Sequence, residues 1–167
     1  MKAYNTRVKT VFGRNWFFDC TWSFSRGYRF NFKQTWPVLY LACDKITASV
    51  EIGPRTREDH IVPHLSGAGD PFLYVDVEVT APVLDLTDLG VRRSLGVTLA
   101  EITIPTEEWD ENMDKGIWAT THQIGQLVLK SNRFGGILFP SFPAFKFLEM
   151  KEKECLAVFM DPSHPAM

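Results

Sequence analysis

Residues 29–51, RFNFKQTWPVLYLACDKITASVE, place a buried strand directly before a short helix. The run VLYLA at 38–42 is apolar and short, which is typical of a strand with both faces covered. Asp44 stands where a helix N-cap belongs, and a following Gly-Pro pair ends a helix over 45–52. Glu51 therefore lies in the last turn of that helix.

Several further strands are predicted outward from this unit. The stretch FLYVDVEVT alternates apolar and polar residues, which indicates a half-buried strand. Further strands are expected where apolar or aromatic runs meet turn signals, at 16–24, 137–140 and 156–160. Residues 81–88 are expected to form a short strand or an extended edge.

Fewer helices than strands are expected. One helix runs from Thr120 or Thr121 to about Lys130, and a helical or irregular segment ends at Glu101. The stretches 55–71 and 106–116 have the composition of loops, the second with some helical turns. Because strands and helices do not alternate strictly, we expect one α+β domain with a mixed, mostly antiparallel core and not a doubly wound fold.

Composition restricts the classes of partner and compartment. The chain has 167 residues, enough for one domain, and a formal net charge of -2, so it lacks the basic excess expected of a nucleic-acid binder. No run approaches the roughly 20 apolar residues that span a bilayer. Three cysteines without a C-x-x-C pair suit a reducing cytoplasm, and these are Cys20, Cys43 and Cys155.

The common catalytic signatures are missing from the sequence. It contains no Walker loop, no G-x-G-x-x-G, no G-x-S-x-G and no H-E-x-x-H. His60 and His64 have the spacing of metal ligands on a helix, but Pro63 argues against that helix, so no metal site is predicted. His122 lies near a predicted helix start, where a capping or solvated histidine is expected.

Four polar residues lie at or near the ends of predicted elements, namely Arg29, Tyr40, Glu51 and Ser141. Element ends are where a rigid scaffold presents polar groups to a cleft. Each also has an ordinary structural explanation: a surface ion pair, a core tyrosine, a solvated helix residue and a turn residue after a proline. Spacing alone leaves both interpretations open.

The order of short motifs resembles the RES domain family, named for its arginine, glutamate and serine. The matching features are Gly27-Tyr28-Arg29-Phe30-Asn31, Pro37-Val38-Leu39-Tyr40-Leu41-Ala42, Thr47-Ala48 with Glu51, Asp85-Leu86-Thr87-Asp88, Gln123-Ile124-Gly125 and Gly136-Ile137-Leu138-Phe139-Pro140-Ser141. Tyr28 departs from a glycine common in the family, and the interval from Arg29 to Tyr40 is one residue longer. We therefore predict a divergent N-terminal segment at 1–25 packed on the core, a RES-like domain at 26–160 and a tail at 161–167.

The resemblance implies a fold similar to ADP-ribosyltransferases and a toxin that consumes NAD, its substrate. Family members are described as breaking the nicotinamide glycosidic bond, with water or phosphate as acceptor, and as neutralised by an antitoxin of Xre type. Two alternatives stay open: a catalytically idle module that binds a nucleotide or partner, and a protein ADP-ribosyltransferase. A homo-oligomer is also left open.

The chemistry of such a reaction agrees with these residue types. A carboxylate stabilises the positive charge that grows on the ribose, and Glu51 is the candidate. Arg29 is the candidate anchor for the phosphates, with Arg26 and Lys33 as helpers and Asn31 in the binding set. Tyr40 offers a ring face or a hydroxyl, and Ser141 a hydroxyl for a ribose or phosphate oxygen, not a covalent nucleophile.

Overall fold

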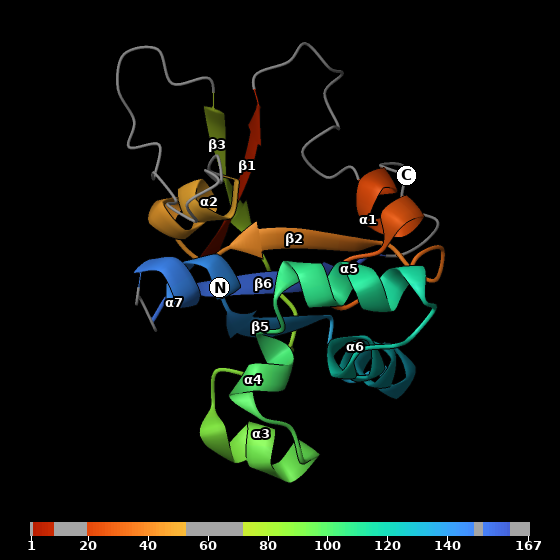
Figure 1. The fold of residues 1–167 in the computed structure, drawn as a ribbon. Helices are drawn as coiled ribbons and strands as arrows, with labels where there is room; N and C mark the ends of the chain where they lie inside the picture. The colour runs from red at the N-terminus through yellow and green to blue at the C-terminus, as the bar shows by residue number, and fades with distance from the viewer. Residues whose placement is uncertain (1, 9–19, 53–71, 149–151, 161–167) are drawn as a thin grey trace.

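A computed structural model describes residues 2–8, 20–52, 72–148 and 152–160 of the chain. The strands form one six-stranded sheet in the order β3-β1-β2-β6-β5-β4. Figure 1 shows β2, β6 and β5 running through the middle of the molecule. The strand bounds are β1 Lys2–Val8, β2 Val38–Ala42, β3 Phe72–Glu78, β4 Val83–Asp85, β5 Gly136–Pro140 and β6 Glu154–Phe159.

The sheet is mixed and mostly antiparallel, as the sequence predicts. Four of the neighbouring pairs run antiparallel, and β4 pairs with β5 in parallel. In the central register Tyr40 lies opposite Ala157, while Cys155 lies between Ala42 on β2 and Phe139 on β5. The ends of β2 and β5 that lead to Glu51 and Ser141 are thus held beside the same end of β6.

Strands β1 and β3 form a long arm at one side of the sheet. They pair along seven positions, from Lys2 opposite Glu78 to Val8 opposite Phe72. Only one Cα pair, Tyr4 with Ala42, joins β1 to β2. The arm rises away from the other strands in Figure 1. Residues 2–8 therefore belong to the sheet, whereas the predicted boundary at residue 26 stays a prediction.

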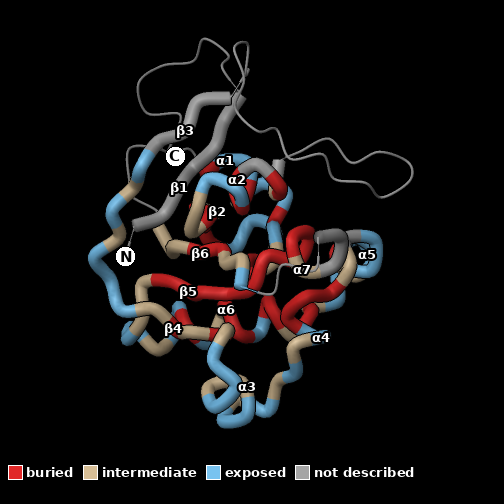
Figure 2. The backbone as a smooth tube through the Cα atoms, turned by 90° about the vertical axis from the view of Figure 1, so that its left-hand side faces the viewer, coloured by how far each residue is buried: buried red, intermediate tan, exposed pale blue. Residues whose placement is uncertain are grey.

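The described helices lie around the central strands. Helices α2 and α7 contact each other at one end of the sheet, while α3 and α4 extend below β5 in Figure 1. Figure 2 shows burial concentrated in β2, β5 and β6 and exposure along α3. The helix bounds are α1 Thr21–Arg26, α2 Lys45–Ile52, α3 Leu89–Leu95, α4 Leu99–Ile102, α5 Thr106–Asp114, α6 Thr120–Ser131 and α7 Phe142–Leu148.

The core lies on both faces of β2, which explains why its sequence is apolar throughout. Val38 and Ala42 join one hydrophobic cluster, against which Tyr40 packs. Leu39 and Leu41 join the cluster on the opposite face. Successive side chains of a strand point to opposite faces, so a strand covered on both sides needs apolar residues at every position.

Most predicted elements are confirmed: the strands at β2 to β6 and the helices at α2 and α6 lie where the sequence places them. The strand predicted over 16–24 is wrong for its described part, because residues 21–26 form α1. There the Ser23 hydroxyl donates to the Val38 carbonyl at 2.6 Å, a tertiary contact that local aromatic composition does not reveal.

Two more helices differ from the prediction. The segment expected as a loop at 106–116 forms α5, with Glu107 and Glu108 in its first turn, where acidic side chains favour a helix N-terminus. Helix α7 follows β5 without any sequence-based expectation. The predicted loop at 55–71, with His60 and His64, and the tail at 161–167 lie outside the described residues.

Candidate active site

Glu51 and Ser141 meet where α2 ends and α7 begins. The Ser141 hydroxyl donates a 2.6 Å hydrogen bond to Oε1 of Glu51. Ser141 also caps α7, because its oxygen accepts from the Ala144 N–H at 3.3 Å. The hydroxyl is buried while the Glu51 side chain is only half-buried. The serine therefore fixes the carboxylate of a residue that is only half-buried.

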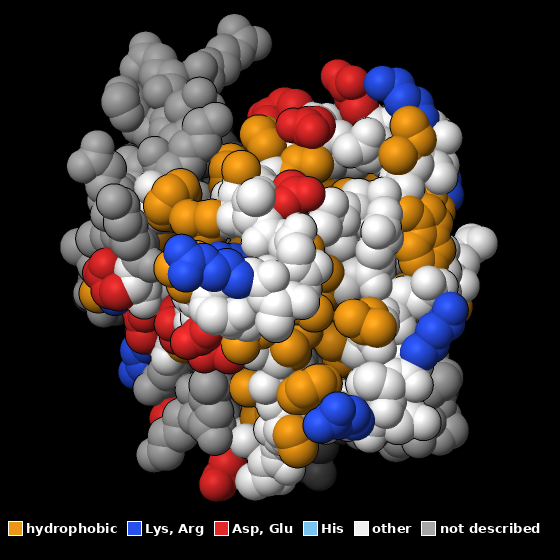
Figure 3. Space-filling model, turned by 90° about the horizontal axis from the view of Figure 1, so that it is seen from below, with side chains coloured by type: hydrophobic (Ala, Val, Ile, Leu, Met, Phe, Trp, Pro, Cys, Tyr) orange, Lys and Arg blue, Asp and Glu red, His pale blue; other side chains and the backbone are white. Residues whose placement is uncertain are grey.

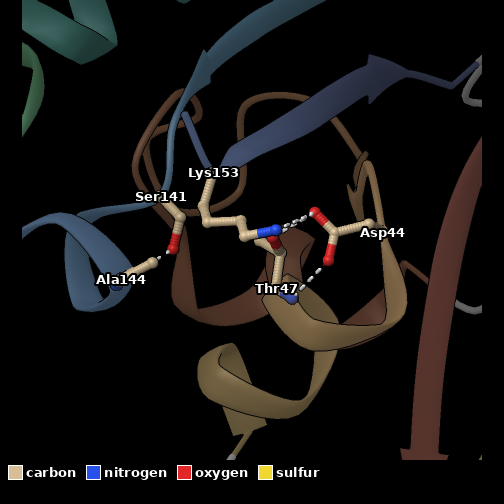
Figure 4. Close-up of polar contacts among 5 residues, drawn as sticks. All are labelled: Asp44, Thr47, Ser141, Ala144 and Lys153. Atoms are coloured by element: carbon tan, nitrogen blue, oxygen red, sulfur yellow. Dashed lines mark hydrogen bonds and ion pairs between the residues drawn. The ribbon is translucent and has the colours of Figure 1, made fainter. Parts of the chain in front are cut away.

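A second set of contacts holds α2 and the Ser141 turn together (Figure 4). Asp44 caps α2 by accepting from the Thr47 N–H and hydroxyl, at 2.9 and 2.8 Å. Lys153 reaches the same carboxylate at 3.4 Å, and its backbone carbonyl accepts from the Ser141 N–H at 2.8 Å. Burial raises the pKa of Asp44, but the hydrogen bonds from Thr47 and the charge of Lys153 outweigh it and leave the pKa lowered.

Arg29 lies at the tip of a tight turn. Two backbone hydrogen bonds between Tyr28 and Asn31 close the turn, at 2.8 and 3.1 Å. The Arg29 Nη1 donates to the carbonyls of Ile102 and Ile104, and its guanidinium lies 5.6 Å from the ring centroid of Phe142. Phe142 directly follows Ser141, so the arginine packs on the chain neighbour of the residue that binds Glu51.

The half-buried Tyr40 and the buried Asn31 form a polar pair that joins the turn. The Tyr40 hydroxyl donates to Oδ1 of Asn31 at 2.9 Å and accepts from the Phe30 N–H at 2.8 Å. The Asn31 amide donates to the carbonyls of Ser23 and Trp36. Burial raises the pKa of Tyr40 well above its usual value, so the hydroxyl stays protonated. Both side chains are committed to shaping the turn that carries Arg29.

A cavity of about 350 Å³ opens on the other side of Arg29. Three cationic side chains and several aromatic ones line it. The guanidinium of Arg26 lies 5.1 Å from the Trp22 ring centroid at this wall. Glu51, Tyr40 and Ser141 are not among its described lining residues, which are Trp22, Ser25, Arg26, Gly27, Tyr28, Arg29, Lys33, Trp109, Asp110, Met113 and Asp114. Arg29 thus lines the cavity and also packs against Phe142, the residue after Ser141.

Comparison with known families decides which family this arrangement belongs to. The family model described as RES domain matches residues 7–167. The chain belongs to the RES domain family. The resemblance carried by the short motifs is therefore confirmed across nearly the whole chain.

The fold of this RES domain is also similar to a solved structure. That structure is described as the crystal structure of the M. tuberculosis MbcT-MbcA toxin-antitoxin complex. The TM-score is 0.57 at 17% sequence identity, over 96% of this chain and 77% of the matched chain. No curated protein matches the sequence. At this identity the likeness shows a shared fold.

The RES domain contains a buried histidine whose role the sequence indicates only in part. The prediction that His122 caps a helix is confirmed, since its Nδ1 accepts from the Ala119 N–H at 3.0 Å. It is not solvated, however: its Nε2 lies 3.2 Å from the Tyr28 carbonyl. Burial, as the largest effect, lowers the pKa of His122 to about 4. The positive charge of Arg29 lowers this pKa further, and the hydrogen bond to the Tyr28 carbonyl raises it in part. The neutral ring therefore donates from Nε2 and fixes the Arg29 turn from below.

Gly125 allows α6 to approach this same turn closely. A Cβ atom at position 125 would lie 1.9 Å from the Phe30 carbonyl oxygen, which no side chain tolerates. Close packing of α6 on Phe30 therefore requires glycine at this position of the family motif. A nearby polar residue in the glycine's helix, Thr121, is fully buried, and its hydroxyl has no hydrogen-bond partner in the described part of the chain.

The described surface adds little to the site. On the face seen from below, hydrophobic side chains are interspersed with charged ones (Figure 3). Isolated exposed apolar side chains such as Leu89 and Leu127 are ordinary on a folded protein. Within residues 2–8, 20–52, 72–148 and 152–160, no helix is long and apolar enough to cross a membrane. Those ranges also hold no group of three His, Cys, Asp or Glu side chains placed for a metal ion.

Proposed function

We propose that this RES protein is a toxin that breaks the nicotinamide glycosidic bond of NAD, and that an antitoxin neutralises it. The observation that carries the proposal is the Glu51 carboxylate, fixed by Ser141 at 2.6 Å, while Arg29 packs on Phe142, the residue after Ser141. Membership of the RES domain family supports NAD as the substrate.

Glu51 is proposed to stabilise the charge that develops on the ribose. As the bond from C1 of the ribose to the nicotinamide nitrogen breaks, its electron pair neutralises the pyridinium ring. Positive charge then spreads over C1 and the ring oxygen, where a nearby carboxylate stabilises it. Water as acceptor gives ADP-ribose, nicotinamide and a proton; phosphate as acceptor gives the 1-phosphate of ADP-ribose and nicotinamide.

Arg29 is proposed to hold the pyrophosphate of NAD. Its Nη1 is occupied by two carbonyls, which fixes the direction of the guanidinium. Among described residues nothing accepts from its Nε or Nη2, so those N–H groups are available to phosphate oxygens. Arg26 and Lys33 in the same cavity wall add positive charge for a doubly anionic ligand, and Asp110 and Asp114 in that wall oppose it in part.

Tyr40, Asn31 and Ser141 are proposed to act through their neighbours. The hydroxyl of Tyr40 and the amide of Asn31 are fully used in shaping the Arg29 turn. The Ser141 hydroxyl proton is used on Glu51. Their contribution is therefore to position Arg29 and Glu51 before substrate arrives, which lowers the reorganisation needed in the transition state.

The partner is proposed on the similar solved structure, a toxin bound to its antitoxin. We infer an antitoxin of Xre type, cytoplasmic action where NAD is present, and a fold of the ADP-ribosyltransferase kind. A protein ADP-ribosyltransferase is the second candidate, because the same leaving-group chemistry serves a protein acceptor. A catalytically idle binding module is the third.

Incubation of the purified protein with NAD, with and without phosphate, tests these functions. Release of nicotinamide with ADP-ribose indicates hydrolysis, and release with the sugar 1-phosphate indicates phosphorolysis. A mass increase on a protein indicates transfer. Glu51→Gln should remove most turnover, whereas Glu107→Gln on the exposed face of α5 should leave it unchanged. Intact folding without NAD loss under either condition would favour the idle module.

A further inference from the structure

Cys155 lies directly under the candidate catalytic carboxylate. It is on β6, opposite Ala42 and Phe139 in the sheet, and it is 4% exposed. Its Sγ lies 3.3 Å from Oε1 of Glu51, within the range of a thiol hydrogen bond. A buried, chemically distinct side chain thus contacts the atom that Ser141 also contacts.

Both of these hydrogen bonds end on the same carboxylate oxygen of Glu51. Oε1 accepts from both Ser141, at 2.6 Å, and Cys155, at 3.3 Å. In the described part of the chain no donor reaches Oε2. One donor, Ser141, caps α7, and the other, Cys155, lies on β6. Two donors from different elements fix the plane of the carboxylate more firmly than one donor does.

The protonation state of the thiol agrees with a donor role. Burial raises the pKa of Cys155 well above its usual value, and the negative charge of Glu51 raises it further. The positive charge of Arg29 lowers this pKa, but by less. The sulfur therefore keeps its proton at neutral pH. A thiolate would repel the carboxylate instead of holding it.

We propose that Cys155 is a positioning residue for Glu51: together with Ser141 it binds Oε1 and leaves Oε2 to face the ribose of the substrate. The proposal rests on the proposed function of Glu51. It assigns a role to a cysteine outside the predicted site, and it predicts which carboxylate oxygen acts on the developing charge.

Three variants test the proposal by kinetics. Cys155→Ala removes the donor and little volume, and Cys155→Ser keeps a shorter donor at the same place. Ile137→Val is the matched control, since it removes one buried heavy atom on the neighbouring strand without touching Glu51. We expect Cys155→Ala to lower kcat roughly 3- to 10-fold with KM unchanged, as the loss of one weak hydrogen bond predicts. Cys155→Ser should recover part of that loss, and Ile137→Val should match the wild type.

A crystal structure of Cys155→Ala gives a readout that does not depend on turnover. The expected result is a Glu51 carboxylate rotated about its last bond or spread over two positions, with α2 unmoved. A carboxylate in its original position, or kcat equal to wild type in an active protein, overturns the proposal. Absence of NAD turnover in the wild type itself overturns the function of the site, while the carboxylate position still decides whether Cys155 orients Glu51.

Discussion

Ser141 Oγ donates to Glu51 Oε1 across 2.6 Å, joining two residues 90 positions apart in the chain. Each residue has a second attachment: Ser141 caps α7, and Glu51 lies in the last turn of α2. The contact therefore fixes two helices relative to each other as well as one carboxylate. Its removal should have separate effects on activity and on stability.

Ser141→Ala is expected to lower kcat about 10- to 100-fold, because a hydrogen bond to a charged group contributes roughly 1.5–3 kcal/mol. The lost cap of α7 should also lower the free energy of unfolding by about 1 kcal/mol. Steady-state NAD turnover and denaturant unfolding measure the two effects. Ser94→Ala, on the exposed face of α3, is the control for both. Full activity in Ser141→Ala would remove the serine from the site.

Arg29→Lys is expected to raise KM for NAD about tenfold with a smaller change in kcat. The arginine can donate to phosphate from its remaining N–H groups while its Nη1 stays bonded to the Ile102 and Ile104 carbonyls. Lysine keeps the positive charge but lacks this planar set of donors. Arg93→Lys on exposed α3 should leave KM unchanged. An equal KM in both variants would mean that the arginine does not hold the phosphates.

Gly125→Ala is expected to destabilise the protein by about 3 kcal/mol or more. The new methyl group would meet the Phe30 carbonyl at 1.9 Å, so either α6 or the Arg29 turn must move. Chemical denaturation followed by circular dichroism measures the loss. Lys130→Ala, exposed on the same helix, should change stability by less than about 0.5 kcal/mol. A wild-type midpoint for Gly125→Ala would contradict the close approach of α6.

His122 should make stability depend on pH between about 6.5 and 4. Its pKa is lowered to about 4 in the folded state from 6.5 in the unfolded chain, so the unfolded chain binds more protons in that interval. The stabilisation is fully present above pH 6.5 and is lost as the pH falls toward 4. The loss should reach roughly 3 kcal/mol.

Unfolding free energies of the wild type and His122→Gln, measured from pH 7.5 to 4, isolate this effect from the carboxylates that titrate nearby. The difference between the two proteins should shrink steadily as the pH falls. A difference that stays constant with pH would show that His122 is not the group that binds the additional proton.

The short-range patterns predicted most of the central elements. The apolar run VLYLA predicts β2, and Asp44 as an N-cap predicts the start of α2. Both are local patterns, because a strand covered on both faces is apolar throughout and a capped helix begins at a characteristic residue. Helices α1 and α7 and strand β1 were not predicted, and α5 was expected only as helical turns within a loop. Aromatic residues near residue 21 favour a strand locally, whereas the helix in the structure lets Ser23 hydrogen-bond β2, a contact between distant parts of the chain.

The candidate site divides in the same way. The sequence by itself determined the family, the residue types and their order: Arg29, Tyr40, Glu51 and Ser141 are recognisable from local motifs. Only the tertiary structure decided that Ser141 and Cys155 meet one oxygen of Glu51, and that His122 and Gly125 support the Arg29 turn. The physical reason is range: caps and strand patterns act between neighbours in the chain, whereas these contacts depend on how α2, α6, α7 and β6 pack around one sheet.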